Sequence, residues 1–97
     1  MVITQAKETI QKAVKAGINY IDTSPWYGDS EKIIGQSLVQ VPRAAYYIAT
    51  KAGRNFTPGW KVRFNFSANA VLKNVENSLA LLGTGYIDII QVIFKRQ

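Results

Sequence analysis

The sequence predicts an α/β fold whose strands run parallel. Three segments with apolar residues at helical spacing alternate along the chain with three short, isoleucine-rich segments of strand character. The second of these short segments, residues 46–50, lacks polar alternation, which is typical of a strand covered on both faces. Strands that alternate with helices are joined by right-handed crossovers and therefore pair in parallel.

The first helix is expected to end at Gly17 and to be followed by a strand over residues 18–23. Its apolar residues recur at the spacing of one helix face: Ala6, Ile10, Ala13 and Val14. Glycine is common just past a helix end, because it adopts a left-handed backbone without strain. Residues 24–29 are then expected to form a loop, since Pro25 has no backbone donor and Gly28 frees the backbone.

The second helix is expected to begin at Ser30, whose hydroxyl can cap the free backbone donors of a first turn. Its apolar face consists of Ile33, Ile34, Leu38 and Val41. Glu31 in the first turn suits the positive end of the helix dipole. Pro42 prevents further extension, a strand follows over residues 46–50, and residues 51–66 are expected to form a long loop.

The third helix has the clearest periodicity in the chain. Its apolar stripe consists of Ala68, Val71, Leu72, Val75, Leu79 and Leu82. Ser67 is placed to cap its start, and Gly83 is placed to end it. A third strand is expected over residues 87–93, and Asp88 near its start is expected to have a structural role rather than a catalytic one.

Length and composition describe one small folded domain. The chain has 97 residues, of which 47% are hydrophobic and 19% charged, as in globular proteins rather than disordered ones. It has no cysteine and no histidine, so we expect no disulfide framework and no metal. It has no apolar run of membrane-spanning length and no signal-like start, so we expect no membrane partner and a cytoplasmic location.

The net charge of +6 makes a nucleic-acid partner an alternative to consider. Basic and aromatic residues interleave at Trp60, Lys61, Arg63, Phe64 and Phe66, a pattern that can bind single strands. The other basic residues are scattered, without a run of five or more, and no nucleic-acid fold motif accompanies them. We therefore expect no nucleic-acid partner and assign this segment to a loop packed on the fold.

Three polar residues fall near the predicted carboxyl ends of two strands. Asp22 is near the end of the first strand, Tyr27 lies in the loop after it, and Lys51 directly follows the second. In α/β folds this edge is where sites are built. A tyrosine has a pKa of about 10 in water, and a nearby ammonium makes such a phenol a stronger acid. The group could give a proton to a carbonyl oxygen, although by residue type alone a solvated lysine is the commoner interpretation.

Four linked motifs connect these residues to a known family. They read G-I-N-Y-I-D-T-S-P-W-Y-G from Gly17, S-E-K-I-I-G from Ser30, I-A-T-K from Ile48 and S-L-A-L-L-G-T-G-Y-I-D-I-I-Q from Ser78. In order and separation they resemble the aldo-keto reductases, over nearly the whole chain. Within that family the chain resembles the branch of L-galactose and arabinose dehydrogenases.

The resemblance implies a partial (β/α)8 TIM barrel with about three βα units. It implies an enzyme that reduces aldehydes or ketones, or oxidises alcohol groups of sugars, with NADP(H) or NAD(H). Tyr27 would be the catalytic proton donor, Lys51 the group that strengthens its acidity, and Asp22 the partner of Lys51. Asp22 would also bind the cofactor near the nicotinamide ribose, and Trp26 would form the substrate pocket with Tyr27.

The chain departs from the family pattern in ways that bear on activity. The family histidine would stand at position 93, which is Ile93 here, and barrel strands are lacking before Val2 and after Gln97. We therefore expect residues 1–97 to be a truncated N-terminal part of an aldo-keto reductase domain that is inactive alone. The alternative is a non-catalytic fragment or binding module, which associates with partner chains or with itself through exposed strand edges.

Overall fold

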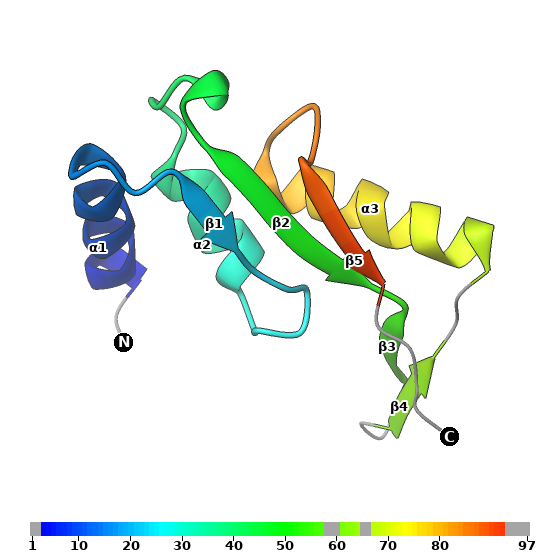
Figure 1. Ribbon diagram of the computed structural model, residues 1–97. Coiled ribbons are helices and arrows are strands. Elements are labelled where there is room, and N and C mark those ends of the chain that lie inside the picture. The colour runs from blue at the N-terminus through cyan, green and yellow to red at the C-terminus, as the bar shows by residue number, and fades with distance from the viewer. Residues whose placement is uncertain (1–2, 58–60, 65–66, 93–97) are drawn as a thin grey trace.

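The computed structural model describes residues 3–57, 61–64 and 67–92 (Figure 1). The helices are α1 (Ile3–Lys15), α2 (Ser30–Ser37) and α3 (Ala68–Leu82), with a 3-10 turn η1 (Arg43–Ala45). The strands are β1 (Tyr20–Asp22), β2 (Tyr47–Ala52), β3 (Arg54–Thr57), β4 (Lys61–Phe64) and β5 (Ile89–Val92). The predicted alternation of helices and strands is confirmed, with β3 and β4 as additions.

The strands β1, β2 and β5 form a parallel sheet in which β2 is central. Asp22 of β1 pairs with Ala49 of β2, and Ala49 pairs on its other side with Ile89 of β5. The predicted α/β fold with parallel strands is therefore confirmed. Because parallel strands present their carboxyl ends at one edge, the ends of β1 and β2 lie together.

Helices cover one face of this sheet. In Figure 1, α2 and α3 lie behind the strands, and α1 lies beside α2 at the β1 side. Successive strand residues point to opposite faces, so Ile21, Ile48 and Thr50 face the helices while Asp22 and Lys51 face away from them. This alternation separates a packed side of the sheet from the side that carries the candidate site.

The core fills the space between the sheet and the helices α2 and α3. Its buried residues are Ile34, Leu38, Tyr46, Ile48 and Leu82. The two helices approach closely at Gly35, where an added Cβ would lie 2.5 Å from the backbone oxygen of Leu81. Leu72, which the sequence pattern assigns to the apolar stripe of α3, is instead exposed.

The segment after Lys51 differs most from the sequence prediction. A loop is predicted over residues 51–66, but Lys51 and Ala52 continue β2, and the antiparallel hairpin β3–β4 follows. Segments 54–57 and 61–64 contain phenylalanine, threonine and valine on either side of a Pro-Gly pair, which is the usual pattern of a hairpin. The loop prediction was wrong, because these strand-forming residues pair as a hairpin. Trp60, Phe66 and Ile93 lie outside the described residues.

The helix ends are partly as predicted. Ser67 caps α3, since its Oγ accepts a hydrogen bond of 3.3 Å from the amide of Ala70, and Gly83 follows α3 with φ +64°. Ser30 does not cap α2: Asp29 is the N-cap, without a side-chain cap bond, and Ser30 is the first helical residue. The helix also ends earlier than predicted, at Ser37.

Candidate active site

Asp22, Tyr27 and Lys51 meet at the carboxyl edge of the parallel sheet. Asp22 is the last residue of β1, and Lys51 is the last but one of β2. Because Asp22 pairs with Ala49, two residues before Lys51, the two charged side chains emerge on the same face of the sheet. Tyr27 comes from the loop between β1 and α2. The structure thus places the three predicted site residues side by side.

The ammonium of Lys51 is the centre of this group. Its Nζ donates hydrogen bonds to Asp22 Oδ1 at 3.2 Å and to the carbonyl oxygen of Thr23 at 2.9 Å. It also lies 5.2 Å from the centre of the Tyr27 ring, within the range of a cation–π contact. The Lys51 side chain is 13% exposed, so protein atoms replace most of the water around this cation.

The other two side chains are open to solvent. The Asp22 side chain is 53% exposed, and Tyr27 is 57% exposed. Within the described part of the chain, neither the Tyr27 hydroxyl nor the second carboxylate oxygen of Asp22 has a hydrogen-bond partner. Lys51 meets Tyr27 at the ring and not at the hydroxyl. One acidic proton and one carboxylate oxygen are therefore available to an incoming molecule.

The loop that carries Tyr27 is braced by its own hydrogen bonds. Ser24 accepts from the amide of Trp26 through its hydroxyl at 3.0 Å, and from the amide of Tyr27 through its carbonyl at 3.2 Å. The carbonyl of Tyr27 then accepts from the amide of Ser30 at 3.1 Å. Gly28 has φ +59°, a conformation that costs glycine little. The chain therefore turns tightly at Tyr27, and the Tyr27 ring lies against the ammonium of Lys51.

A pocket of about 510 Å³ opens beside the group. Asp22 and Tyr27 line its polar end, and apolar residues of α1 and α2, such as Ile10 and Ile33, line the remainder. The carboxylate and hydroxyl groups in its lining can hydrogen-bond a small polar ligand, whereas the apolar residues follow the outer edge of β1. Trp26, the predicted pocket wall, is half-buried and does not line this pocket.

A set of polar residues behind the group was not predicted as part of the site. We call it the polar layer, and its members are Thr23, Ser30, Glu31, Thr50 and Ser78. The hydroxyls of Thr23 and Ser30 lie 2.8 Å apart, and the carboxylate of Glu31 accepts hydrogen bonds from the other two hydroxyls. Glu31 lies in the first turn of α2, as the sequence predicts, and it is 2% exposed. Its position in the first turn of α2 was the only signal, because its bonding partners are distant in sequence.

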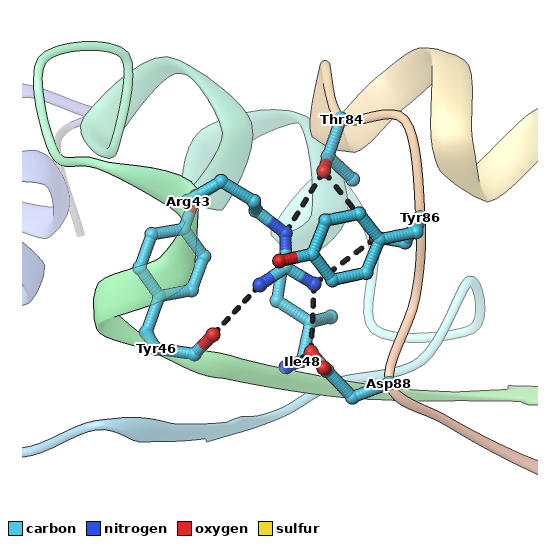
Figure 2. Close-up of polar contacts among 6 residues, drawn as sticks. All are labelled: Arg43, Tyr46, Ile48, Thr84, Tyr86 and Asp88. Carbon is cyan, nitrogen blue, oxygen red and sulfur yellow. Dashed lines mark hydrogen bonds and ion pairs between the residues drawn. The ribbon is translucent and has the colours of Figure 1, made fainter.

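The amino edge of the sheet holds a second polar group, which Figure 2 shows around Arg43. The guanidinium lies 2.7 Å from Asp88 Oδ2 and donates to Thr84 Oγ1 at 2.9 Å. It also donates to the carbonyl oxygens of Tyr46 at 2.7 Å and Tyr86 at 3.0 Å. Its plane is flanked by the two tyrosine rings, whose centres lie 4.9 and 4.0 Å from Cζ. Four of the five donors of this cation are thus bonded to protein atoms in the described structure.

Two pKa values respond to this arrangement. The hydrogen bond from Arg43, with a second from the amide of Ile48, holds the pKa of Asp88 below its usual value. Burial raises the pKa of Tyr46, and the charge of Arg43 opposes that rise. Asp88 therefore joins η1, β2 and β5 as an ionised carboxylate, which agrees with the structural role predicted for it.

Across the described residues, no three histidine, cysteine, aspartate or glutamate side chains gather as metal ligands would. Among the helices of the same residues, none is long and apolar enough to cross a membrane.

Known proteins match this chain in sequence. The Aldo/keto reductase family model matches residues 1–93. L-galactose dehydrogenase from Arabidopsis thaliana is 45% identical over 89 residues, which make up 88% of this chain and 26% of that protein. D-arabinose 1-dehydrogenase from Saccharomyces cerevisiae is 39% identical over 88 residues, 87% of this chain and 25% of that protein. The chain thus spans about a quarter of the length of these curated relatives.

A solved structure matches in fold as well. The holo form of an aldo-keto reductase from Bacillus halodurans aligns with a TM-score of 0.85 at 31% identity, over 94% of this chain and 31% of that one. The predicted kinship with sugar dehydrogenases and the partial-barrel fold both agree with these matches. A family match over nearly all residues, together with this fold, leads to one conclusion: the chain belongs to the aldo/keto reductase family.

Proposed function

We propose that residues 1–97 are the N-terminal part of the catalytic domain of an NAD(P)H-dependent oxidoreductase. The complete domain reduces aldehydes or ketones, or oxidises alcohol groups of sugars. The observation that carries the proposal is the ammonium of Lys51, held by Asp22 and Thr23 beneath the ring of Tyr27 at the carboxyl edge of the sheet. That edge is where parallel α/β enzymes place their catalytic groups.

Each member of the group has a distinct task in this proposal. The Tyr27 hydroxyl gives its proton to the carbonyl oxygen of the substrate during reduction, and takes it back during oxidation. Lys51 stabilises the phenolate that remains, because its side chain is 13% exposed and its ammonium lies close to the ring. Asp22 holds the ammonium of Lys51 in place through their ion pair. Trp26, next to Tyr27 in the same loop, supplies an apolar wall for the substrate.

The cofactor is the second part of the proposal. The family implies NADP(H) or NAD(H), and the free carboxylate oxygen of Asp22 suits a ribose hydroxyl, which donates a hydrogen bond. When bound, the nicotinamide supplies or accepts the hydride. A hydride transfer with a tyrosine as proton donor needs no metal, so we assign none. We also assign a cytoplasmic location, a small carbonyl or sugar substrate and no nucleic-acid partner.

A second candidate function follows from the strand edges. In the described sheet, β1 and β5 each have one neighbour, so each presents an unpaired outer edge. Such edges add strands from other chains readily. The 97 residues taken alone are accordingly proposed to be inactive, and could act as a non-catalytic fragment or binding module that associates with itself or with partner chains.

The experiment that tests the first proposal is a graft. Residues 3–92 replace the matching segment of the Arabidopsis L-galactose dehydrogenase, and the purified graft is assayed with sugars and small aldehydes using both nicotinamide cofactors. We expect turnover that Tyr27→Phe lowers by about 10²- to 10⁴-fold, the range of a lost proton donor. A folded graft without turnover, or with turnover that is insensitive to Tyr27→Phe, would refute the proposal.

The 97-residue chain itself tests the second candidate. Size-exclusion chromatography with and without the full-length relative measures association, and nicotinamide fluorescence measures cofactor binding. Saturable micromolar binding of cofactor by the chain alone favours residual enzyme character over a binding module. A folded monomer that binds neither cofactor nor relative excludes both the module and self-association.

A further inference from the structure

We propose that Glu31 is a positioning residue for the reaction: it fixes the first turn of α2 on β2 and thereby sets the approach of Tyr27 to Lys51. The inference rests on the proposed function, because it concerns the geometry of the same proton donor. Glu31 itself touches neither of these side chains in the described structure. It acts through the polar layer defined above.

The burial of Glu31 is the first observation. A carboxylate is seldom fully buried unless it is paired, yet Glu31 is 2% exposed and has no cation within ion-pair distance among the described residues. Its partners are two hydroxyls: Thr50 Oγ1 donates at 2.6 Å and Ser78 Oγ at 3.0 Å. Both hydroxyl residues are buried as well. A short bond of this kind restricts where the helix can lie on the strand.

The place of these bonds is the second observation. Thr50 directly precedes Lys51, and its side chain points behind the sheet because strand residues alternate in direction. Ser30, the neighbour of Glu31, pairs its hydroxyl with Thr23, which directly follows Asp22 and whose carbonyl accepts from Lys51. The first turn of α2 is therefore joined to both strands immediately behind the two charged residues of the site.

The position of Tyr27 depends on the same turn. Its carbonyl accepts from the amide of Ser30, so the loop runs directly from Tyr27 into the anchored helix start. A shift of this helix start moves the Tyr27 ring, while Lys51 stays with β2 and Thr23. Glu31 thus controls a distance between two groups that it does not touch. A displacement of one ångström in such a distance costs an enzyme about 10²-fold in rate.

The test compares Glu31→Gln with Glu76→Gln, a control at an exposed carboxylate on α3. Glutamine keeps the volume of Glu31, so the graft is expected to fold, but one of its two contacts must reverse donor and acceptor. For the graft carrying Glu31→Gln we expect kcat to fall about tenfold or more while KM changes less than about twofold. The control should leave both parameters unchanged.

A second readout needs no activity. The ε-methylene signals of Lys51, recorded by NMR on lysine-labelled graft, should be shifted upfield by the Tyr27 ring, and Tyr27→Leu calibrates the loss of that shift. Glu31→Gln should lose much of the shift, and Glu76→Gln none. Unchanged Lys51 signals and unchanged kcat in Glu31→Gln would overturn the inference. If no graft turns over, the proposed function fails, and the Lys51 signal alone still decides whether Glu31 positions the pair.

Discussion

The two ion pairs of the parallel sheet lie at opposite edges and differ in how fully their atoms are used. At the amino edge, Arg43 and Asp88 are 2.7 Å apart, and their side chains are 18% and 20% exposed. At the carboxyl edge, Lys51 and Asp22 are 3.2 Å apart, and Asp22 is 53% exposed. The first pair is enclosed on both sides, whereas the second is enclosed only at its cation.

The choice of cation matches this difference. The planar guanidinium of Arg43 presents five donors in fixed directions, and four of them here meet two carbonyls, a hydroxyl and a carboxylate between two aromatic rings (Figure 2). The ammonium of Lys51 is a compact charge on a flexible stem, and it holds one carboxylate oxygen and one carbonyl. Among the described residues, Arg43 directs four of its five donors to protein atoms, while the Lys51 group leaves the Tyr27 hydroxyl and an Asp22 oxygen open.

Under the proposed function, one short sheet separates stability from chemistry. In parallel α/β barrels the amino edge typically serves stability and the carboxyl edge serves catalysis. The described sheet shows a contrast of the same kind: one edge holds a cation bonded to four protein groups, and the other holds a cation beside an open hydroxyl and an open carboxylate oxygen. Changes at the amino edge should therefore alter the free energy of unfolding, and changes at the carboxyl edge should alter the rate.

The largest effect is expected for Lys51→Met in the graft. Removing the ammonium leaves the Tyr27 phenolate without its cation, so kcat/KM should fall about 10²- to 10⁴-fold. Urea unfolding should change by no more than about 1 kcal/mol, because the pair is half open to water. Lys73→Met, at an exposed position on α3, is the control. If the loss of unfolding free energy exceeded the loss of transition-state stabilisation, the claim that this edge affects rate more than stability would be wrong.

Arg43→Met should show the reverse pattern. It removes the donors to the carbonyls of Tyr46 and Tyr86, which should lower the unfolding free energy by about 2–3 kcal/mol. Because Arg43 is at the far edge from Lys51, kcat of the folded protein should stay near that of the parent graft. Urea titrations paired with active-site assays measure both quantities, with the exposed Lys12→Met as control. A collapse of kcat at unchanged stability would contradict the assignment of this edge.

Part of this arrangement could be predicted from the sequence. The rest depends on bonds between residues that lie far apart along the chain. The Asp22, Tyr27 and Lys51 group could be predicted, because each residue follows or ends a strand within a recognisable motif and parallel strands bring their ends together. The alternating helices and strands could be predicted from periodicity. The hairpin β3–β4 could have been predicted from its β-forming residues, but the same segment also resembles a polar loop with interleaved basic and aromatic residues.

The two networks around Arg43 and Glu31 could not be predicted in the same way. Arg43 bonds to residues more than forty positions away, and Glu31 to residues 19 and 47 positions away. Local pattern therefore described Arg43 as one of several scattered bases and Glu31 as an acid at a helix start. Only the tertiary arrangement of α2, β2, α3 and the loop before β5 shows that both are enclosed. The sequence pattern thus predicted which residues gather near the strand ends, and it missed the bonds that cross the fold.

The pH dependence of stability should separate the edges further. The pKa of Asp88 is lower in the folded chain than in the unfolded one, so the unfolded state binds more protons as the pH falls below about 4. The stabilisation by Asp88 is then present above that pH and is lost as the pH falls through the lowered pKa. Urea midpoints of the graft at several acidic pH values should show this loss, and Asp88→Asn should reduce it. If the urea midpoint depends on pH equally in Asp88→Asn and in the parent graft, the acid sensitivity comes from a group other than Asp88.

The smallest effect on stability is expected for Asp22→Asn. This variant tests most directly whether the carboxyl edge contributes little to the free energy of unfolding. The Asp22 carboxylate is half exposed and meets a single described partner, so its loss should change the unfolding free energy by less than about 1 kcal/mol. The ammonium of Lys51 keeps the carbonyl of Thr23, which should hold it close to its present position. Turnover should nevertheless fall, because Asp22 is the proposed partner of both the ammonium and the ribose. If Asp22→Asn destabilised the graft as much as Arg43→Met, the ion pair at the carboxyl edge would stabilise the fold as the one at the amino edge does. The proposed division between the two edges would then not hold.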